Sequence, residues 1–294
     1  MFASIHSKIV AGLSMIALLA AGCSSNAVSP SDVASSQDGQ GTSAGAQSGK
    51  ALSHIKDSGT LKVGTEAQYA PYEFKDKEAN FAGADIVLAQ KIADKLGVKL
   101  QVVDMSFDGI IPAVQSGQVD LGIAAFSTTP DRAKVIDFSD PYEKSAQVLI
   151  VAAQKKDTYT TAASLKGQKV GAQKGSIQSQ LVTQGLPDST LFEAEKYPNL
   201  ALETQNGNIA GFVVDQAVGN QLVDTSNGAL AASSFKFDDS VAQVGKAVVM
   251  AKGNDDLKSA VDDVIKQMTA DGSYKKAYDD AVKLAASLGL NSDN

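Results

Sequence analysis

The sequence predicts an α/β protein of two lobes, each a mostly parallel sheet flanked by helices, with two segments crossing between the lobes. With 294 residues, 44% of them hydrophobic, the chain can bury one large core or two moderate ones. From Leu52 onward, strand-like and helix-like patterns alternate at α/β spacing. A second such series begins near residue 147. Parallel strands covered by helices explain this rhythm.

The first series predicts most of lobe one, over residues 51–146. The expected strands are Leu61–Glu66, Leu100–Val103 and Val119–Phe126. The expected helices are Asp85–Leu96, which has apolar residues at helical period and ends at a glycine, and Phe107–Gln115.

The second series predicts lobe two, over residues 147–245. Strands are expected at Val148–Ala153, Lys169–Ala172 and Ile209–Val214, and helices at Ile177–Thr183 and Asp215–Leu222.

The end of the chain is expected to return to lobe one, which therefore also takes residues 246–294. A strand at Val244–Met250 precedes two long amphipathic helices, Asp255–Ala270 and Ser273–Ala286. The segments near 145–149 and 243–247 would then cross between the lobes. Such paired crossings can act as a hinge beside a ligand cleft.

The N-terminus predicts export and a lipid anchor. Lys8 precedes the apolar run Ile9–Ala21, which is too short to span a bilayer comfortably and indicates a signal peptide over residues 1–22. The run leads to Cys23, the only cysteine, through small residues that resemble a bacterial lipobox, although Ala20 stands where leucine is commoner. We expect Cys23 to be lipidated; ordinary signal cleavage that leaves a free thiol is the alternative.

Residues 23–50 predict a flexible linker. They are rich in Ser, Gly, Gln and Ala and have almost no bulky apolar residue whose burial could offset the entropy of ordering. A linker of this composition reaches about 30 Å. We therefore expect an extracytoplasmic domain held near a membrane by its lipid.

Composition argues against several function classes. The net charge of -7 and pI of about 4.9, without a basic cluster, argue against nucleic acid as a partner. After processing, His54 and Cys23 are the only histidine and cysteine, so His-based, thiol and zinc sites lack their parts. No nucleotide-binding loop is found. We expect no cofactor, no metal and no enzymatic activity, although chemistry using only carboxylates stays open.

The stretch STTPDRAKVIDFSDPY contains Arg132, the only arginine of the chain. Thr129 is suited to cap a helix that starts at Pro130, directly after a predicted strand. The guanidinium is a planar fork that fits a carboxylate, and the helix start adds N–H donors. The pattern predicts an anion receptor at the end of a strand. A salt bridge to Asp131 or Asp137 is the alternative.

Five motifs in order resemble the extracytoplasmic solute-binding proteins (family 3) of polar amino-acid ABC importers. The resemblance covers essentially Leu52–Leu290. The motifs are GTEAQYAPYEF, GADIVLAQKIADKLGV, FDGIIPAVQSGQVDLGI, STTPDRAKVIDFSDPY and LKGQKVGAQKGSIQSQL. The resemblance implies a periplasmic-binding-protein-like fold (type II), a lipoprotein form, a monomer, an amino acid as ligand and an ABC permease as partner.

The resemblance also implies how the ligand backbone is held. Arg132 would clamp the α-carboxylate with help from backbone around Ser127 and Thr129. The backbone N–H of Ile177 would reach the same carboxylate from lobe two. Asp215 would hold the α-ammonium; capping its own helix is the alternative role.

Further positions would contact the ligand side chain. Tyr69 and Phe107 would sandwich it, unless they are core aromatics. Glu66 would meet its polar tip, unless it is solvated. Gln173 and Gln178 are further candidates. These acid and amide groups favour a basic or amide ligand such as arginine, lysine or glutamine.

Two departures from the family pattern bear on specificity. Ala84 and Val87 stand where an aromatic and a second acid are common, and Ala124 and Ala125 where hydroxyl or glycine residues are frequent. The alanine pair removes possible hydrogen bonds to the ligand.

We expect capture of an amino acid by lobe closure and delivery to an importer. A membrane-coupled sensor using the same cleft, and a dehydratase acting on a small carboxylate, are the alternatives.

Overall fold

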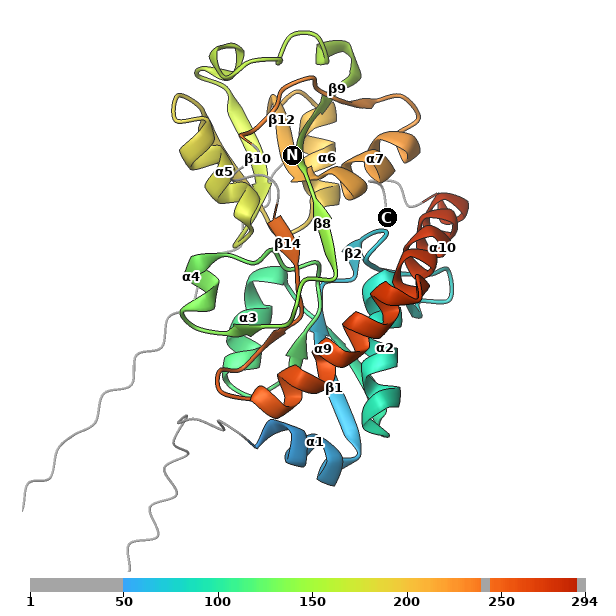
Figure 1. Cartoon of the computed structure of the whole chain (residues 1–294). Helices are drawn as coiled ribbons and strands as arrows, with labels where there is room; N and C mark the ends of the chain where they lie inside the picture. The colour runs from blue at the N-terminus through green and yellow to red at the C-terminus, as the bar shows by residue number, and fades with distance from the viewer. Residues whose placement is uncertain (1–49, 239–243, 290–294) are drawn as a thin grey trace, which may run out of the picture. The chain divides into compact units, whose positions relative to one another are not determined.

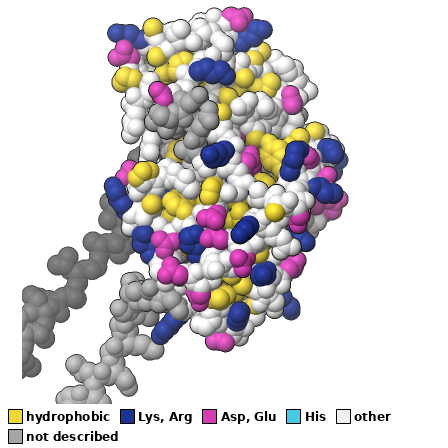
Figure 2. Space-filling view, in the orientation of Figure 1, with side chains coloured by type: hydrophobic (Ala, Val, Ile, Leu, Met, Phe, Trp, Pro, Cys, Tyr) yellow, Lys and Arg dark blue, Asp and Glu magenta, His cyan; other side chains and the backbone are white. Residues whose placement is uncertain are grey.

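The computed structural model describes residues 50–238 and 244–289, and all of them belong to one compact unit. The predicted signal peptide, Cys23 and the linker up to residue 49 lie outside the described residues, as does Gln243 of the second crossing. Within the described ranges, no helix is long and apolar enough to cross a membrane. On the face shown in Figure 2, acidic and basic side chains are interspersed.

The first lobe is built on a five-stranded sheet (Figure 1). Its strands, in spatial order, are β5 (Lys99–Asp104), β1 (Thr60–Thr65), β6 (Leu121–Gly122), β15 (Val249–Met250) and β7 (Asp137–Phe138). β1 is parallel to β5 and β6, whereas β15 is antiparallel to β6 and β7. The sheet is therefore mixed, because the returning C-terminal segment enters it in the opposite direction.

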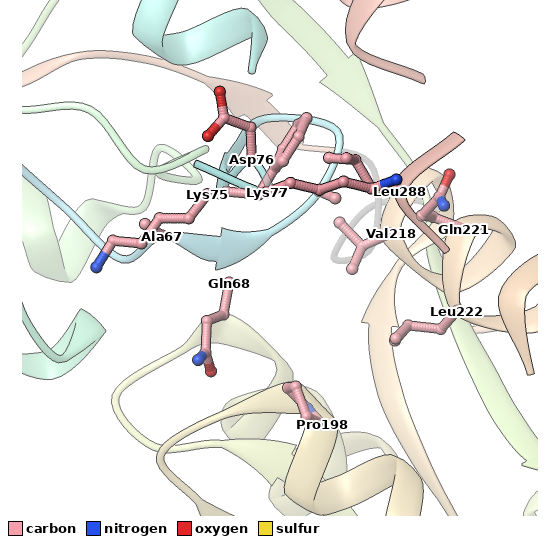
Figure 3. A pocket seen from close by; sticks show the side chains of 12 residues that line it. Ala67, Gln68, Lys75, Asp76, Lys77, Pro198, Val218, Gln221, Leu222 and Leu288 are labelled. Atoms are coloured by element: carbon pink, nitrogen blue, oxygen red, sulfur yellow. The ribbon is translucent and has the colours of Figure 1, made fainter. Parts of the chain in front are cut away.

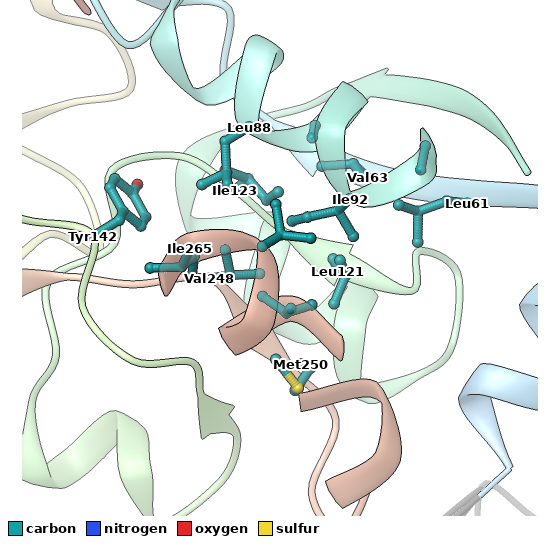
Figure 4. Packing of buried hydrophobic residues seen from close by; sticks show 14 of the residues in the cluster. Leu61, Val63, Leu88, Ile92, Leu121, Ile123, Tyr142, Val248, Met250 and Ile265 are labelled. Atoms are coloured by element: carbon teal, nitrogen blue, oxygen red, sulfur yellow. The ribbon is translucent and has the colours of Figure 1, made fainter. Parts of the chain in front are cut away.

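Helices surround this sheet and bury its apolar residues. They are α1 (Ala51–Ser58), α2 (Ala84–Leu96), α3 (Phe107–Gln115), α9 (Asp255–Ala270) and α10 (Ser273–Leu288). In the core, Leu88 and Ile92 of α2 pack with Val63 of β1, Leu121 of β6 and Ile265 of α9 (Figure 4). The chain beyond residue 246 thus completes the core that the first half begins.

The second lobe repeats this plan. Its five strands are β11 (Thr190–Ala194), β10 (Lys169–Gln173), β12 (Gly211–Asp215), β9 (Gln147–Ala152) and β13 (Leu230–Ala232). β10 is parallel to β11 and β12, and β9 is antiparallel to β12 and β13. The helices are α5 (Ile177–Gly185), α6 (Tyr197–Gln205) and α7 (Gln216–Thr225), with the 3-10 turns η1 (Ala153–Lys155) and η2 (Ala162–Leu165). Every residue of β9 and β12 is buried, as expected for strands covered on both faces.

Two short strands join the lobes. β8 (Glu143–Ser145) and β14 (Val244–Lys246) pair antiparallel, with Lys246 opposite Glu143 (Figure 1). The predicted crossings lie in this neighbourhood, but the pairing on the first segment begins two residues earlier than expected. Side-by-side strands of this kind can bend together as a hinge.

Two predicted strands are shorter in the structure. Only Leu121–Gly122 of Val119–Phe126 is strand, because the chain turns at Ala125, whose φ of 47° is incompatible with an extended strand. Val244–Met250 divides into β14, which joins the hinge, and β15, which joins the first sheet.

Around the cleft the structure differs from the sequence-based expectation in two places. A small sheet of β2 (Gln68–Tyr69), β3 (Glu73–Lys75) and β4 (Phe81–Ala82) is present that the sequence patterns did not predict. The helix predicted after Thr129 is α4 (Pro130–Ala133), a single turn. A helix this short has little macrodipole, so its N-terminus adds less positive potential than expected.

Candidate functional site

A small cavity of about 20 Å³ brings together residues from both lobes. Its lining consists of Glu66, Tyr69, Glu73, Phe107, Ala124, Ala125, Ser127, Arg132, Gln173, Ser176, Ile177 and Gln178. Eight of the ten predicted ligand-binding residues are in this set; Thr129 and Asp215 are not. Such a volume holds about one water molecule. An amino acid therefore needs the lobes or the lining side chains to move apart.

Arg132 is the cation on the wall of this cavity. Its Nη1 donates to the carbonyl of Ser127 at 2.9 Å, and its Nη2 donates across the cleft to the carbonyl of Gly175 at 3.1 Å. The guanidinium also lies 5.4 and 5.3 Å from the ring centroids of Phe107 and Phe126. Stacking and neutral acceptors hold the fork in place without neutralising its charge.

The salt-bridge alternative for Arg132 is wrong. Asp131 pairs with Lys134 at 2.6 Å, and Asp137 pairs with Lys252 at 3.1 Å. Burial lowers the pKa of Arg132 to about 10, which leaves the guanidinium charged at neutral pH. The side chain can therefore meet an anion that enters the cavity.

Thr129 acts on the backbone rather than on the cavity. Its hydroxyl accepts a hydrogen bond from the Arg132 N–H at 3.2 Å and caps α4, as the sequence predicts. The cap fixes the turn from which Arg132 projects.

The two predicted sandwich aromatics have different surroundings. Phe107 is the first residue of α3, is half-buried and stacks on Phe126 with centroids 4.7 Å apart. Tyr69 is 8% exposed and packs on Tyr197 at 5.2 Å within the core of lobe two. Tyr69 thus fits the core alternative and also lines the cavity.

Glu66 is a buried acid, so the solvated alternative is wrong. It is 3% exposed and follows β1 directly. The amide of Gln173 donates to the Glu195 carbonyl at 2.8 Å and lies 3.5 Å from Glu66 Oε2. Burial raises the pKa of Glu66 to about 7. The carboxyl can therefore change its charge near neutral pH, and a cation in the cavity would favour the ionised form.

Lobe two contributes the start of α5 to the cavity. Ser176 caps this helix and Ile177 is its first residue, whose N–H has no acceptor within the helix. The amide of Gln178 donates to Gln147 Oε1 at 2.6 Å. These residues offer polar groups opposite Arg132.

Asp215 lies outside the cavity lining and has two partners. Its Oδ1 accepts the Ala217 N–H at 3.0 Å, so it caps α7, as the alternative reading predicted. Its Oδ2 accepts from the ammonium of Lys246, and both side chains are at most 2% exposed. Asp215 and Lys246 therefore form a buried ion pair in which each residue neutralises the charge of the other.

Comparison with known proteins identifies the family to which the chain belongs. Residues 61–282 match the model of the bacterial extracellular solute-binding proteins, family 3. The chain belongs to this family. It is 30% identical over 224 residues to the L-cystine-binding protein TcyJ of Escherichia coli, covering 76% of this chain and 83% of that protein.

Solved structures of the family have the same fold. The amino acid ABC transporter substrate-binding protein AbpA of Streptococcus pneumoniae, bound to L-arginine, is 35% identical with a TM-score of 0.77, covering 80% of this chain and 99% of that one. The ancestral amino acid-binding protein AncCDT-1, a precursor of cyclohexadienyl dehydratase, is 33% identical with a TM-score of 0.70, covering 78% and 97%. These matches confirm the predicted two-lobed α/β fold and an amino-acid-binding family.

Two charged residues of this family member were missed by sequence reasoning. Glu73 lines the cavity, is 1% exposed, and its Oε2 has no hydrogen-bond partner among the described residues. Lys246 is 1% exposed. Glu73 stands within a quoted motif, YAPYEF, where it could have been considered. Lys246 carried no signal, because a lysine in the apolar run VGKAVVM indicates only a strand.

A larger cavity of about 460 Å³ lies elsewhere (Figure 3). Lys75, Asp76 and Lys77 line it from β3 and the turn that follows, and Val218 and Leu222 line it from α7. None of the predicted site residues lines it. Volume alone identifies no chemistry, so we assign the candidate site to the smaller cavity, where charges converge.

Proposed function

We propose that this protein captures a polar or charged amino acid between its lobes and delivers it to an ABC importer. The observation that carries the proposal is Arg132, a charged fork held by stacking and by carbonyls of both lobes at the wall of one shared cavity. A ligand carboxylate on this fork would gain two parallel charge-assisted hydrogen bonds. Its contacts with both lobes would favour the closed form.

The remaining roles follow from position. Backbone near Ser127 and the N–H of Ile177 would complete the carboxylate site, while Thr129 holds the turn. Asp215 would receive the α-ammonium once its own ion pair opens. Phe107 would contact the ligand side chain.

The side-chain end of the site favours a basic or amide amino acid. Glu66 lies beside Gln173, and Tyr69 and Gln178 line the same cavity. A cationic side chain would lower the pKa of Glu66 and pair with it. An acidic side chain would face a buried carboxyl and be disfavoured.

We further propose an extracytoplasmic monomer whose lobe one comprises residues 51–146 and 246–294 and whose lobe two comprises 147–245. Lipidation of Cys23 would anchor it beside its permease. The similarity to binding proteins supports transport over catalysis. A sensor using the same cleft is the second candidate, because closure could be recognised by a receptor as well as by a permease.

A thermal-shift screen of the twenty amino acids followed by calorimetry tests this proposal. We expect a basic or amide amino acid to give the largest shift. The Arg132→Ala variant should lose about 10 to 100-fold in affinity, the equivalent of one charge-assisted contact.

The matched control is Lys134→Ala, which removes an exposed cation two residues away. It should bind as the parent does. Absence of a shift with every amino acid would refute the binding function, and an Arg132→Ala variant of parental affinity would refute the carboxylate assignment.

A further inference from the structure

Lys246 is a lysine buried at the joint between the lobes. It is 1% exposed, its ammonium contacts Asp215, and it lies 4.7 Å from the ring centroid of Tyr72. Burying an ammonium is costly unless a carboxylate pairs with it. The lysine and Asp215 therefore depend on each other in this conformation.

Asp215 of this pair is the acid proposed above to hold the α-ammonium of the ligand. Asp215 is beyond the cavity lining, but Tyr69, whose pKa is raised by burial and then by Tyr197 and Asp215, is on it. The α-ammonium of a ligand that reaches Asp215 past Tyr69 would therefore meet a carboxylate that is already paired with Lys246. Two ammonium groups cannot share one buried carboxylate without mutual repulsion.

The backbone of Lys246 is fixed, so only its side chain can give way. Its carbonyl accepts the Tyr142 N–H at 2.9 Å, and the residue forms a bridge with Ser127. The next residue, Ala247, donates to the Phe126 carbonyl at 2.9 Å. The ammonium is attached to this fixed backbone by a flexible four-carbon side chain, so it can change position while the strand stays in place.

Other acids surround the lysine and offer it a second position. Burial raises the pKa of Glu73, Asp85 and Glu143, and the charge of Lys246 acts against this increase in all three. Asp85 accepts from Tyr142 and Ala125, and Glu143 accepts from Tyr72. Glu73 Oε2 has no hydrogen-bond partner among the described residues, so it is the acceptor best suited to take the displaced ammonium.

We propose that Lys246 is a tethered competitor for Asp215: a ligand's α-ammonium reaches this carboxylate only by displacing the lysine ammonium, which turns toward Glu73. The inference rests on the proposed function and deepens it. It predicts that this protein discriminates only weakly between an α-amino acid and the same acid without its α-amino group.

Calorimetry with two pairs of probes tests the competition. The pairs are L-arginine with 5-guanidinopentanoate, and L-glutamine with 4-carbamoylbutanoate; within each pair only the α-amino group differs. Lys246→Met should raise the preference for the α-amino form at least about tenfold, since a charge-assisted contact becomes available to the ligand alone. Lys144→Met, which removes an exposed lysine from the paired strand β8, should leave the preference unchanged.

An unchanged or reduced preference in Lys246→Met would overturn the competition. Lys246→Gln, which keeps a polar contact to Asp215 without the charge, is the second variant if the Met protein does not fold. The parent alone is also decisive, because a preference above about 100-fold for the α-amino form would exclude an effective competitor. Should the parent bind neither arginine nor glutamine, the amino acid with the largest shift in the screen of twenty and its analogue without the α-amino group replace the two pairs. If no amino acid gives a shift, the proposed function fails and this inference fails with it.

Discussion

Arg132 and Asp215, the two charged groups predicted to hold the ends of an amino acid, are satisfied by the fold in opposite ways. Arg132 is half-buried, lines the cavity and donates to carbonyls that carry no net charge. Asp215 is 1% exposed, lies off the cavity and is paired with a full cation. Neutral carbonyl acceptors can hold a charged side chain in position and leave its charge free to pair with a ligand ion. A counter-ion such as Lys246 neutralises the charge of its partner. The first arrangement prepares a binding group, and the second stabilises the fold until something displaces it.

The largest expected difference between Arg132 and Asp215 is the effect of substituting each residue on the stability of the fold. Asp215→Asn keeps the helix cap but breaks the buried ion pair and leaves the Lys246 ammonium to turn toward Glu73, so it should cost about 3 kcal/mol of unfolding free energy, the lower end for a broken buried pair. Urea denaturation without added amino acid measures this. Arg132→Ala should cost clearly less. The double variant Asp215→Asn with Lys246→Met should regain most of the loss, and a double variant as unstable as the single one would contradict the ion-pair account.

Glu66, a buried acid of the cavity lining, should give a pH-dependent effect on stability. Burial raises its pKa from 4.5 to about 7, so its contribution to stability is fully present below about pH 4.5 and is lost as the pH rises through 7. Glu66→Gln cannot ionise and should be more stable than the parent by up to about 3 kcal/mol at pH 8, and by far less at pH 5. Urea denaturation at both pH values checks the sign. A gain that does not grow with pH would show that Glu66 is not held in its neutral form.

Substitution of Gly175 tests whether lobe closure requires the backbone of lobe two to approach Asp108 of lobe one closely. Its φ is 74°, and a Cβ there would lie 2.8 Å from the Cβ of Asp108 in the opposite lobe. Gly175→Ala should therefore weaken amino-acid binding by about tenfold, or 1 to 2 kcal/mol, by opposing closure.

Gly167 is the matched control, because its φ is 72° and a Cβ there would meet nothing within 4 Å. Gly167→Ala carries the same backbone strain without the clash. Calorimetry should show parental affinity for it. Equal losses in both variants would attribute the effect to strain rather than to the interface.

The smallest expected effect concerns the cap beneath Arg132. Thr129→Ala removes the hydroxyl that accepts the Arg132 N–H and should cost about 1 kcal/mol of stability. Because Thr129 does not line the cavity, affinity should fall less than threefold. Thermal denaturation and calorimetry on one sample compare the two. A loss of affinity comparable to that of Arg132→Ala would place Thr129 in direct contact with the ligand.

Sequence reasoning succeeded where local patterns determine structure. The helix periods predicted α3 and α9 to the residue, and the Thr129-Pro130 signal predicted the start of α4. The family motifs predicted eight residues of the cavity lining, which extend over more than a hundred positions from Glu66 to Gln178. Each of these inferences depends on neighbouring residues or on a shared motif.

It failed where a property depends on distant contacts. The turn at Ala125 shortened a strand that looked continuous, and at this turn the Ala125 N–H donates to Asp85, which is distant in the chain. Lys246 carried no signal of burial in the sequence, because its burial depends on Asp215, which is distant in the chain. A charged side chain can be recognised as buried only when its partner is known.

The size of the cavity also sets a time scale. A space of about 20 Å³ bounded by Arg132, Ile177 and Phe107 leaves no passage for a molecule the size of an amino acid. Where release proceeds by the lobes moving apart at the β8–β14 ribbon, the dissociation rate cannot exceed the rate of that opening. Residence time would be controlled at the hinge, and substitutions there would change how long the protein stays recognisable to a membrane partner without touching a single ligand contact.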